Sequence, residues 1–177
     1  MSIRKTVFAG IIAALYAALT IALNPISYGE IQLRIAEVLC ILPFFFPAAI
    51  PGLFVGCIIA NIFSPYGPLD MIAGSLASLL AATLTMLIGR INRDKILIKA
   101  FACFPPVAIN AVVIGAVIAW VTVDTTVAFW SAFAVFGMWV GLGQLVVMYV
   151  LGLPLMVYLP KTQVINKLMR LYKGEQQ

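Results

Sequence analysis

Histidine is absent from the 177 residues of this chain, and charged residues are scarce. Without histidine, the chain has no imidazole for a hydrolase triad, for a zinc site with His ligands or for a proton relay. Charged residues make up only 10% of the chain, hydrophobic residues make up 64%, and the mean hydropathy is +1.12. Soluble domains contain about a quarter charged and about half apolar residues. The composition therefore predicts an integral membrane protein.

Cysteine is also rare, and its positions do not suit a metal site or a disulfide framework. Cys40, Cys57 and Cys103 are odd in number, lack metal-ligand spacing and lie in apolar stretches. This pattern predicts small, buried core residues. The chain also lacks a Gly-x-x-x-x-Gly-Lys-Ser/Thr loop, so it cannot hydrolyse ATP unaided. We therefore expect no metal, no cofactor and no enzymatic activity.

Apolar stretches joined by short polar segments predict an all-α bundle of six transmembrane helices, forming one domain over residues 1–177. Pro43, Pro47 and Pro51 each remove a backbone hydrogen bond from the second long apolar stretch. They predict a turn near 47–51 that divides this stretch into two short helices. The predicted spans are 7–23, 34–47, 50–64, 70–88, 99–121 and 127–157, followed by a basic cytoplasmic tail at 160–177.

The distribution of positive charge supports the same number of spans. Ten of the eleven Lys and Arg residues fall in three clusters: at the N-terminus, between the fourth and fifth predicted spans, and after the last span. Because basic loops remain in the cytoplasm, an even number of crossings must separate these clusters. Six helices with both termini cytoplasmic meet this condition. The basic loops are expected to contact anionic lipid rather than nucleic acid.

A polar segment between the first two spans predicts a small-molecule site on the outer face. It reads Tyr28-Gly-Glu-Ile-Gln-Leu-Arg-Ile-Ala-Glu37 and supplies the candidate ligand-binding residues Glu30, Gln32, Arg34 and Glu37. Ionisable groups are costly within a span and mark functional sites. Arg34 and Glu37 lie three residues apart, on one face of a helix. A mutual ion pair that only pins the loop is therefore the alternative interpretation.

Further candidate ligand-binding side chains lie at the ends of later spans or inside them. Asn61 lies near the end of the third predicted span, and Asp70 opens the fourth, where it would also suit a helix cap. Asn110 and Gln144 lie in the last two spans, where an amide can instead join helices. Aromatic residues crowd the outer boundary, as expected of a membrane-interface belt. Among them, Tyr66 is our candidate for stacking on a flat ring.

Small residues recur at four-residue spacing along the first span, in two adjacent stripes. The first stripe is Ala9, Ala13 and Ala17, and the second is Gly10, Ala14, Ala18 and Ala22. Such stripes let another helix approach closely. The first stripe is predicted to contact a partner protein, although burial inside the bundle would explain the same pattern.

Three segments carry a family resemblance: Gly29-Glu-Ile-Gln-Leu-Arg-Ile-Ala-Glu-Val38, Leu42-Pro-Phe-Phe-Phe-Pro-Ala-Ala-Ile-Pro-Gly-Leu-Phe-Val-Gly-Cys57 and Leu69-Asp-Met-Ile-Ala-Gly-Ser-Leu-Ala-Ser78. They resemble the QueT family, the substrate-binding (S) components of energy-coupling-factor (ECF) transporters for queuosine precursors. The motif Ile-Gln-Leu-Arg-Ile-Ala-Glu and the proline-rich turn are the more specific parts. The resemblance implies six helices with both termini cytoplasmic.

The resemblance also implies partners and a substrate. An Ala-x-x-x-Ala surface on the first span would dock onto a transmembrane coupling subunit in the bacterial plasma membrane, driven by two cytoplasmic ATPases. The substrate would be 7-aminomethyl-7-deazaguanine or a close relative. We hypothesise that Glu37 binds one set of its N–H donors and that Asp70 or Glu30 binds the other.

Other functions are compatible with parts of this pattern. The alternatives are an S component for another vitamin, with the same architecture, and a membrane assembly subunit that transports nothing. An intramembrane enzyme is the third alternative, but the chain offers no plausible base beside a nucleophile.

Overall fold

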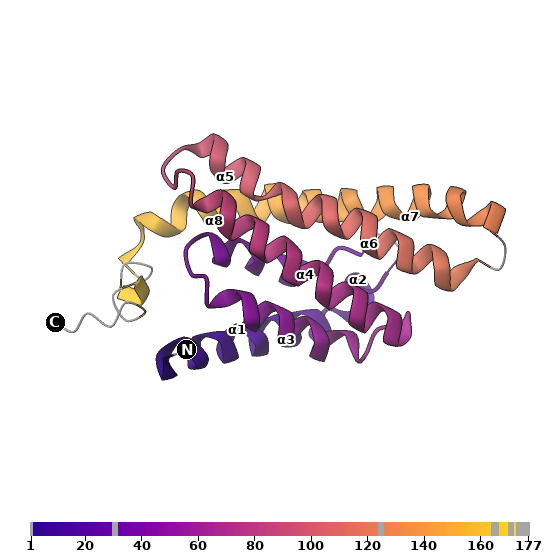
Figure 1. Cartoon of the computed structure of the whole chain (residues 1–177), viewed down its shortest axis with the longest axis horizontal. Helices are drawn as coiled ribbons and strands as arrows, with labels where there is room; N and C mark the ends of the chain where they lie inside the picture. The colour runs from indigo at the N-terminus through magenta and orange to yellow at the C-terminus, as the bar shows by residue number, and fades with distance from the viewer. Residues whose placement is uncertain (1, 30–31, 124–125, 164–166, 170–171, 173–177) are drawn as a thin grey trace.

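The structure of the chain, a computed structural model, describes residues 2–29, 32–123, 126–163, 167–169 and 172 (Figure 1). Every regular element within these ranges is helical, as the sequence predicts. In chain order the elements are α1 (Ile3–Ala22), α2 (Asn24–Ser27), η1 (Ile35–Phe44), α3 (Ala49–Asn61), α4 (Gly67–Gly89), α5 (Ile96–Ala102), α6 (Phe104–Thr122), α7 (Thr126–Val146), η2 (Val147–Gly152), α8 (Leu153–Tyr158) and η3 (Leu159–Lys161).

Four stretches of the described chain are long and apolar enough to cross a membrane, namely Ile3–Ala22, Gly67–Gly89, Ile96–Thr122 and Ala128–Lys161. Two shorter apolar helices, η1 and α3, accompany them. With rises of about 2.0 Å per residue for η1 and 1.5 Å for α3, each is about 20 Å long. Large apolar side chains such as Ile72, Leu76 and Leu80 project from α4 into the surroundings. The chain is therefore a multi-pass helical membrane protein.

The segment predicted as a helix over 34–47 adopts a different helical form. Residues Ile35–Phe44 form a 3₁₀-helix, with Pro43 inside it. A 3₁₀-helix of this length is uncommon because its hydrogen bonds have poorer geometry, and such segments often mark functional positions. Proline and apolar content predict where this helix ends, but they do not distinguish the 3₁₀ form from the α form.

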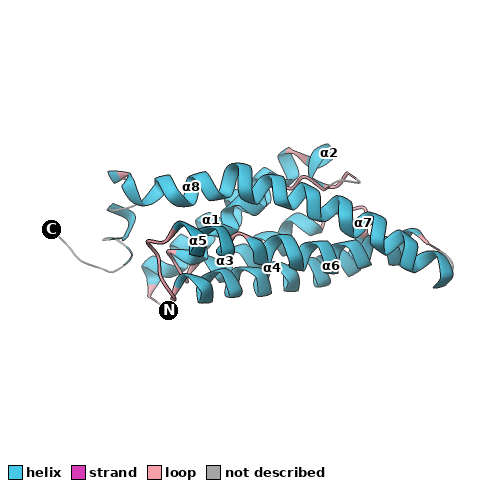
Figure 2. Cartoon of the chain, turned by 90° about the horizontal axis from the view of Figure 1, so that it is seen from above, coloured by secondary structure: helices cyan, strands magenta, loops and turns pink. Residues whose placement is uncertain are grey.

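Both termini of the helical bundle lie at the same end. The start of α1, the connection between α4 and α5, and the end of η3 gather at the left of Figure 1, and the view in Figure 2 agrees. We call this the basic end, because it carries Arg4, Lys5, Arg90, Arg93, Lys95 and Lys161. The opposite end holds α2, the turn between α3 and α4, and the tips of α6 and α7 (Figure 1).

The first small-residue stripe of α1 is buried inside the bundle. Ala9, Ala13 and Ala17 are 8%, 6% and 6% exposed. Two glycines of α3 face them: a Cβ added to Gly56 would lie 2.8 Å from the Ala13 carbonyl oxygen, and one added to Gly52 would collide with the Ala9 carbonyl. Burial inside the bundle, the alternative explanation, therefore accounts for this stripe because α3 packs against that face, and contact of these three alanines with a partner stays a prediction.

The second stripe of α1 remains open. Gly10, Ala14, Ala18 and Ala22 are all exposed, and a Cβ added to Gly10 would meet no atom within 4 Å. The two faces of α1 thus differ: one packs against α3, and the other presents small residues to the surroundings.

Candidate functional site

Three polar side chains meet at the turn between α3 and α4. Asn61 ends α3, Asp70 lies in the first turn of α4, and Ser64 lies between them. Ser64 Oγ donates a hydrogen bond to Asp70 Oδ2 at 2.5 Å, and Asn61 Nδ2 donates to the Asp70 carbonyl oxygen at 3.1 Å. Gly67 has a φ of 69°, which glycine adopts without strain. The turn thereby holds a buried carboxylate beside a buried amide.

Arg34 approaches the same carboxylate from the segment before η1. Its Nη2 lies 3.8 Å from Asp70 Oδ2, and the two side chains are 3% and 0% exposed. The guanidinium carbon of Arg34 lies 5.3 Å from the centre of the Tyr28 ring, which suits a cation–π contact. Within the described chain, the ion-pair partner of Arg34 is thus Asp70, and not Glu37 as in the alternative interpretation of the sequence.

Glu37 is a buried carboxylate whose hydrogen bonds come from uncharged groups. Tyr16 Oη donates to Glu37 Oε1 at 2.5 Å, and Cys40 Sγ donates to Glu37 Oε2 at 3.1 Å. Glu37 is 1% exposed. A buried charge without a charged partner is costly. A ligand that brings a positive charge near Glu37 would offset part of this cost.

Cys57 on α3 links the two parts of this polar cluster. Its Sγ accepts hydrogen bonds from Asn61 Nδ2 at 3.4 Å and from Ser78 Oγ at 3.4 Å, and Tyr16 Oη lies 3.8 Å away. Tyr16 also contacts Glu37, whereas Asn61 also contacts Asp70. The side chains of α1, η1, α3 and α4 therefore form one connected network.

Several buried polar atoms of the described chain have no hydrogen-bond partner within it. They are Ser27 Oγ, Gln32 Nε2, Arg34 Nε and Nη2, Asn61 Oδ1, Asp70 Oδ1 and Gln144 Oε1. Buried polar groups are almost always paired in folded proteins, so each exception needs an explanation. The set contains both donors and acceptors, which a polar ligand could satisfy.

Gln32 combines such an unpaired atom with an unusual backbone conformation. Its φ is 45°, the one positive value at a non-glycine residue among those that the structure describes. Backbone strain of this kind concentrates at functional sites. The Gln32 side chain is buried, so the strained residue also presents an amide in the protein interior.

Asn110 and Gln144 lie deeper in the bundle and are both buried. Ile114, one turn after Asn110 on α6, reaches toward α4, where its Cδ1 would lie 3.4 Å from a Cβ added to Gly74. Asn110 is therefore about one helical turn closer to the basic end than this contact. Gln144 on α7 leaves its Oε1 unpaired. Both amides are thus buried within the bundle, and their contact with a ligand stays a prediction.

Two further candidate ligand-binding residues are Tyr66, which the structure describes, and Glu30, which it does not. Tyr66 directly precedes α4 and packs against the cluster of Ile114, Ile118 and Val140. Its ring is therefore near the outer ends of α4, α6 and α7. Glu30 lies outside the described residues, so its position relative to the cluster stays a prediction.

Tyr16 and Tyr28 belong to the polar cluster although neither was a candidate from the sequence. Tyr28 is buried and donates its hydroxyl hydrogen to the Ala60 carbonyl oxygen at 2.5 Å. Burial raises the pKa of Tyr28 above its usual value, so the hydroxyl stays protonated and able to donate. Tyr16 lies on the same helix face as Ala13, and a tyrosine hydroxyl on such a buried stripe was the available signal.

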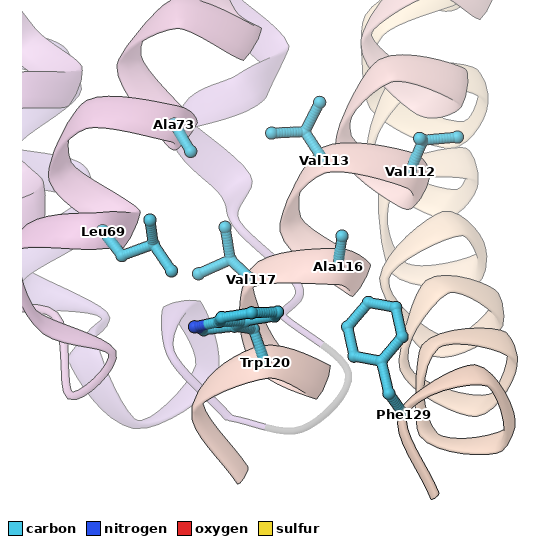
Figure 3. Close-up of a pocket in the computed structure, with 8 residues that line it drawn as sticks. All are labelled: Leu69, Ala73, Val112, Val113, Ala116, Val117, Trp120 and Phe129. Carbon is cyan, nitrogen blue, oxygen red and sulfur yellow. The ribbon is translucent and has the colours of Figure 1, made fainter. Parts of the chain in front are cut away.

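An apolar groove of about 420 Å³ lies apart from the polar cluster, between α4 and α6 (Figure 3). It is lined by Leu69, Ala73, Val112, Val113, Ala116, Val117, Trp120 and Phe129. Trp120 is 72% exposed, in keeping with the interface belt. The groove offers no charged or amide side chain, so it does not suit a polar heterocycle.

The profile of the family described as "QueT transporter" matches residues 6–161 of the chain. A protein of Lactococcus lactis subsp. cremoris (strain MG1363), described as "Queuosine precursor transporter QueT", is 39% identical over 87 residues. That match covers 48% of this chain and 51% of the relative, so the chain spans about half the length of the relative it matches. No solved structure matches the chain.

Proposed function

The chain belongs to the QueT transporter family, and from this premise we propose that it is the substrate-binding S component of an ECF-type importer for a queuosine precursor. The family is one of transporters and not of enzymes. The name of the Lactococcus lactis relative supports a queuosine precursor as the substrate.

The observation that carries the proposal is the buried polar cluster with unpaired donors and acceptors. Arg34, Glu37 and Asp70 are all buried, and two acids face one base. If all three are ionised, the cluster carries one uncompensated negative charge, which favours a cationic ligand. 7-Aminomethyl-7-deazaguanine has a primary ammonium, several N–H donors and a carbonyl acceptor, and these groups match the unpaired atoms.

The ligand groups can be assigned to the two acids. Glu37 binds one set of donors and Asp70, or Glu30, binds the other, because ionised acceptors make the stronger hydrogen bonds. The carbonyl of the ligand needs a donor, and Arg34 Nε and Nη2, Gln32 Nε2 and the amide of Asn110 are the candidates. An aromatic face such as Tyr66 would cover the ring.

The orientation in the bacterial plasma membrane follows from the basic end. Lys and Arg residues gather where α1 begins, where α4 meets α5 and where η3 ends (Figure 1). Positively charged loops remain in the cytoplasm. The basic end is therefore cytoplasmic and the turn between α3 and α4 faces outward, which requires η1 and α3 to act as two short spans in a six-span bundle.

Energy for uptake comes from partner proteins in this proposal. The chain has no nucleotide-binding Gly-rich loop of its own. A transmembrane coupling subunit, driven by two cytoplasmic ATPases, binds the exposed small-residue stripe Gly10, Ala14, Ala18 and Ala22 of α1, where a partner helix can approach closely. Tilting of the whole S component then presents the ligand to the cytoplasm.

The test is to identify what the protein binds. The full chain, purified in mild detergent, is examined by mass spectrometry for a copurified small molecule and then titrated calorimetrically with 7-aminomethyl-7-deazaguanine. A saturable binding isotherm and a ligand of this class support the proposal. A copurified ligand of another vitamin class would identify a different S component. The absence of any ligand-induced thermal shift would indicate a membrane assembly subunit.

A further inference from the structure

The acids of the cluster differ in which of their oxygens are free. Both oxygens of Glu37 accept hydrogen bonds, from Tyr16 and from Cys40. Asp70 uses Oδ2 for Ser64 and for the ion pair with Arg34, and its buried Oδ1 has no partner. Asp70 Oδ1 is thus an open acceptor in a region closed to solvent.

Asn61 supplies a second open acceptor next to the first. Its Nδ2 donates to the Asp70 carbonyl oxygen, which can only accept, so the orientation of the amide is determined. The same nitrogen also reaches Cys57 Sγ. Asn61 Oδ1 therefore has no partner and is fully available to a donor.

Gly74 lets the Asn61 amide and the Asp70 carboxylate lie close against α4. A Cβ added to Gly74 would lie 2.7 Å from Asn61 Nδ2 and 3.0 Å from Asp70 Oδ1. Any side chain at this position would displace the Asn61 amide. Gly74 lies one helical turn after Asp70, on the same face of α4. Only glycine at this position leaves the two acceptors where they are.

Arg34 adds a donor on the far side of the carboxylate. Its Nη2 lies 3.8 Å from Asp70 Oδ2, and both Nη2 and Nε are buried without a hydrogen-bond partner. The atoms without a hydrogen-bond partner are therefore two acceptors, Asn61 Oδ1 and Asp70 Oδ1, and the donors of Arg34. This array complements a ring edge that presents a donor, a donor and an acceptor.

We propose that Asn61, Asp70 and Arg34 form a subsite that selects a 2-amino-4-oxopyrimidine edge, with Gly74 as the residue that lets the Asn61 amide and the Asp70 carboxylate take their positions. The two N–H donors of this edge meet Asn61 Oδ1 and Asp70 Oδ1, and its carbonyl meets Arg34. A ring without the 2-amino group leaves Asn61 Oδ1 unpaired, and sites built to pair a polar group reject ligands that lack it. The proposal rests on the proposed function, because it concerns the ligand of that site.

The experiment compares two probes on the full chain in detergent micelles. They are 7-aminomethyl-7-deazaguanine and its analogue without the 2-amino group, and the measured quantity is the ratio of their dissociation constants. We expect the wild-type protein to favour the 2-amino probe at least tenfold. The Gly74→Ala variant should lose most of this preference, because its Cβ displaces the Asn61 amide.

Gly89→Ala is the matched control on the same helix. A Cβ there would lie 2.9 Å from the Phe44 ring, so it crowds the packing to a similar degree, but at the basic end. This variant should be less stable and keep the wild-type ratio. If Gly74→Ala does not fold, Asn61→Ala removes the same acceptor without crowding and should likewise bring the ratio close to one.

The outcomes separate the subsite from the function. Equal affinity of the wild-type protein for the two probes would overturn the subsite and leave the proposed function in place. A wild-type ratio retained in Gly74→Ala and Asn61→Ala would do the same. Failure of the wild-type protein to bind either probe would overturn the proposed function and the subsite together.

Discussion

Tyr16 on α1 donates a hydrogen bond to Glu37 on η1, with its Oη 2.5 Å from Glu37 Oε1. The two residues are 21 positions apart and both are buried. This bond ties the first helix to the carboxylate at the centre of the polar cluster. The conformation of α1 and the binding properties of Glu37 are therefore linked.

Removing the Tyr16 hydroxyl should destabilise the fold. In Tyr16→Phe, Glu37 Oε1 loses its donor while remaining buried, and an unpaired buried acceptor costs about 1–3 kcal/mol. Unfolding of the purified protein in detergent, followed by temperature or denaturant, measures the loss. Tyr158→Phe is the control, since Tyr158 is exposed and should tolerate the change. Equal stability of the two variants would show that the bond contributes nothing.

Neutralising Glu37 should weaken ligand binding. Hydrogen bonds to an ionised acceptor are worth about 1.5–3 kcal/mol, so Glu37→Gln is expected to bind 7-aminomethyl-7-deazaguanine at least tenfold more weakly in a calorimetric titration. Asp94→Asn, an exposed acid at the basic end, serves as the control and should bind normally. Unchanged affinity in Glu37→Gln would exclude this carboxylate from the ligand site.

The two stripes of α1 should respond differently to a bulky side chain. Ala14→Trp adds bulk to the exposed stripe, so ligand binding should be retained while uptake by cells that express the coupling proteins is abolished. Ala13→Trp places the same bulk against Gly56, and the overpacked protein should lose stability by about 1–3 kcal/mol or more. Normal uptake by Ala14→Trp would move the docking surface elsewhere.

The orientation can be tested by labelling introduced cysteines on intact cells. All three native cysteines are buried, so they should give little background with a membrane-impermeant maleimide. Pro65→Cys, in the exposed turn between α3 and α4, should react on intact cells. Arg93→Cys should react only after the membrane is permeabilised. The reverse pattern would invert the proposed topology.

The charged residues of the cluster could be singled out from the sequence, but their burial and their pairing could not. Arg34, Glu37 and Asp70 stand out because charge is costly in an apolar chain. Their spacing offered an Arg34–Glu37 pair on one helix face as an alternative interpretation. In the structure η1 begins only at Ile35, and Arg34 lies before it with a non-helical conformation. Arg34 therefore faces α4, and no pattern within the segment indicates this.

The sequence likewise did not determine which of the two α1 stripes faces the interior of the bundle. The two stripes are one residue apart, so they differ by about 100° around the helix, and either could face inward. Gly52 and Gly56, four residues apart on α3, match Ala9 and Ala13 and were the complementary signal. That signal becomes meaningful only when α3 is known to lie beside α1, which is information about tertiary packing.

The tight seam made by Gly52 and Gly56 against α1 has a mechanical consequence. Backbones in such close contact cannot slide past each other without a clash, so α1 and α3 should behave as one rigid lever. The outer end of this lever carries Asn61, and the free side of α1 lies only about one helix diameter, roughly 10 Å, from α3. A partner protein that moves α1 would therefore move α3 and Asn61 with it, so the proposed docking surface and the proposed ligand site would be mechanically coupled.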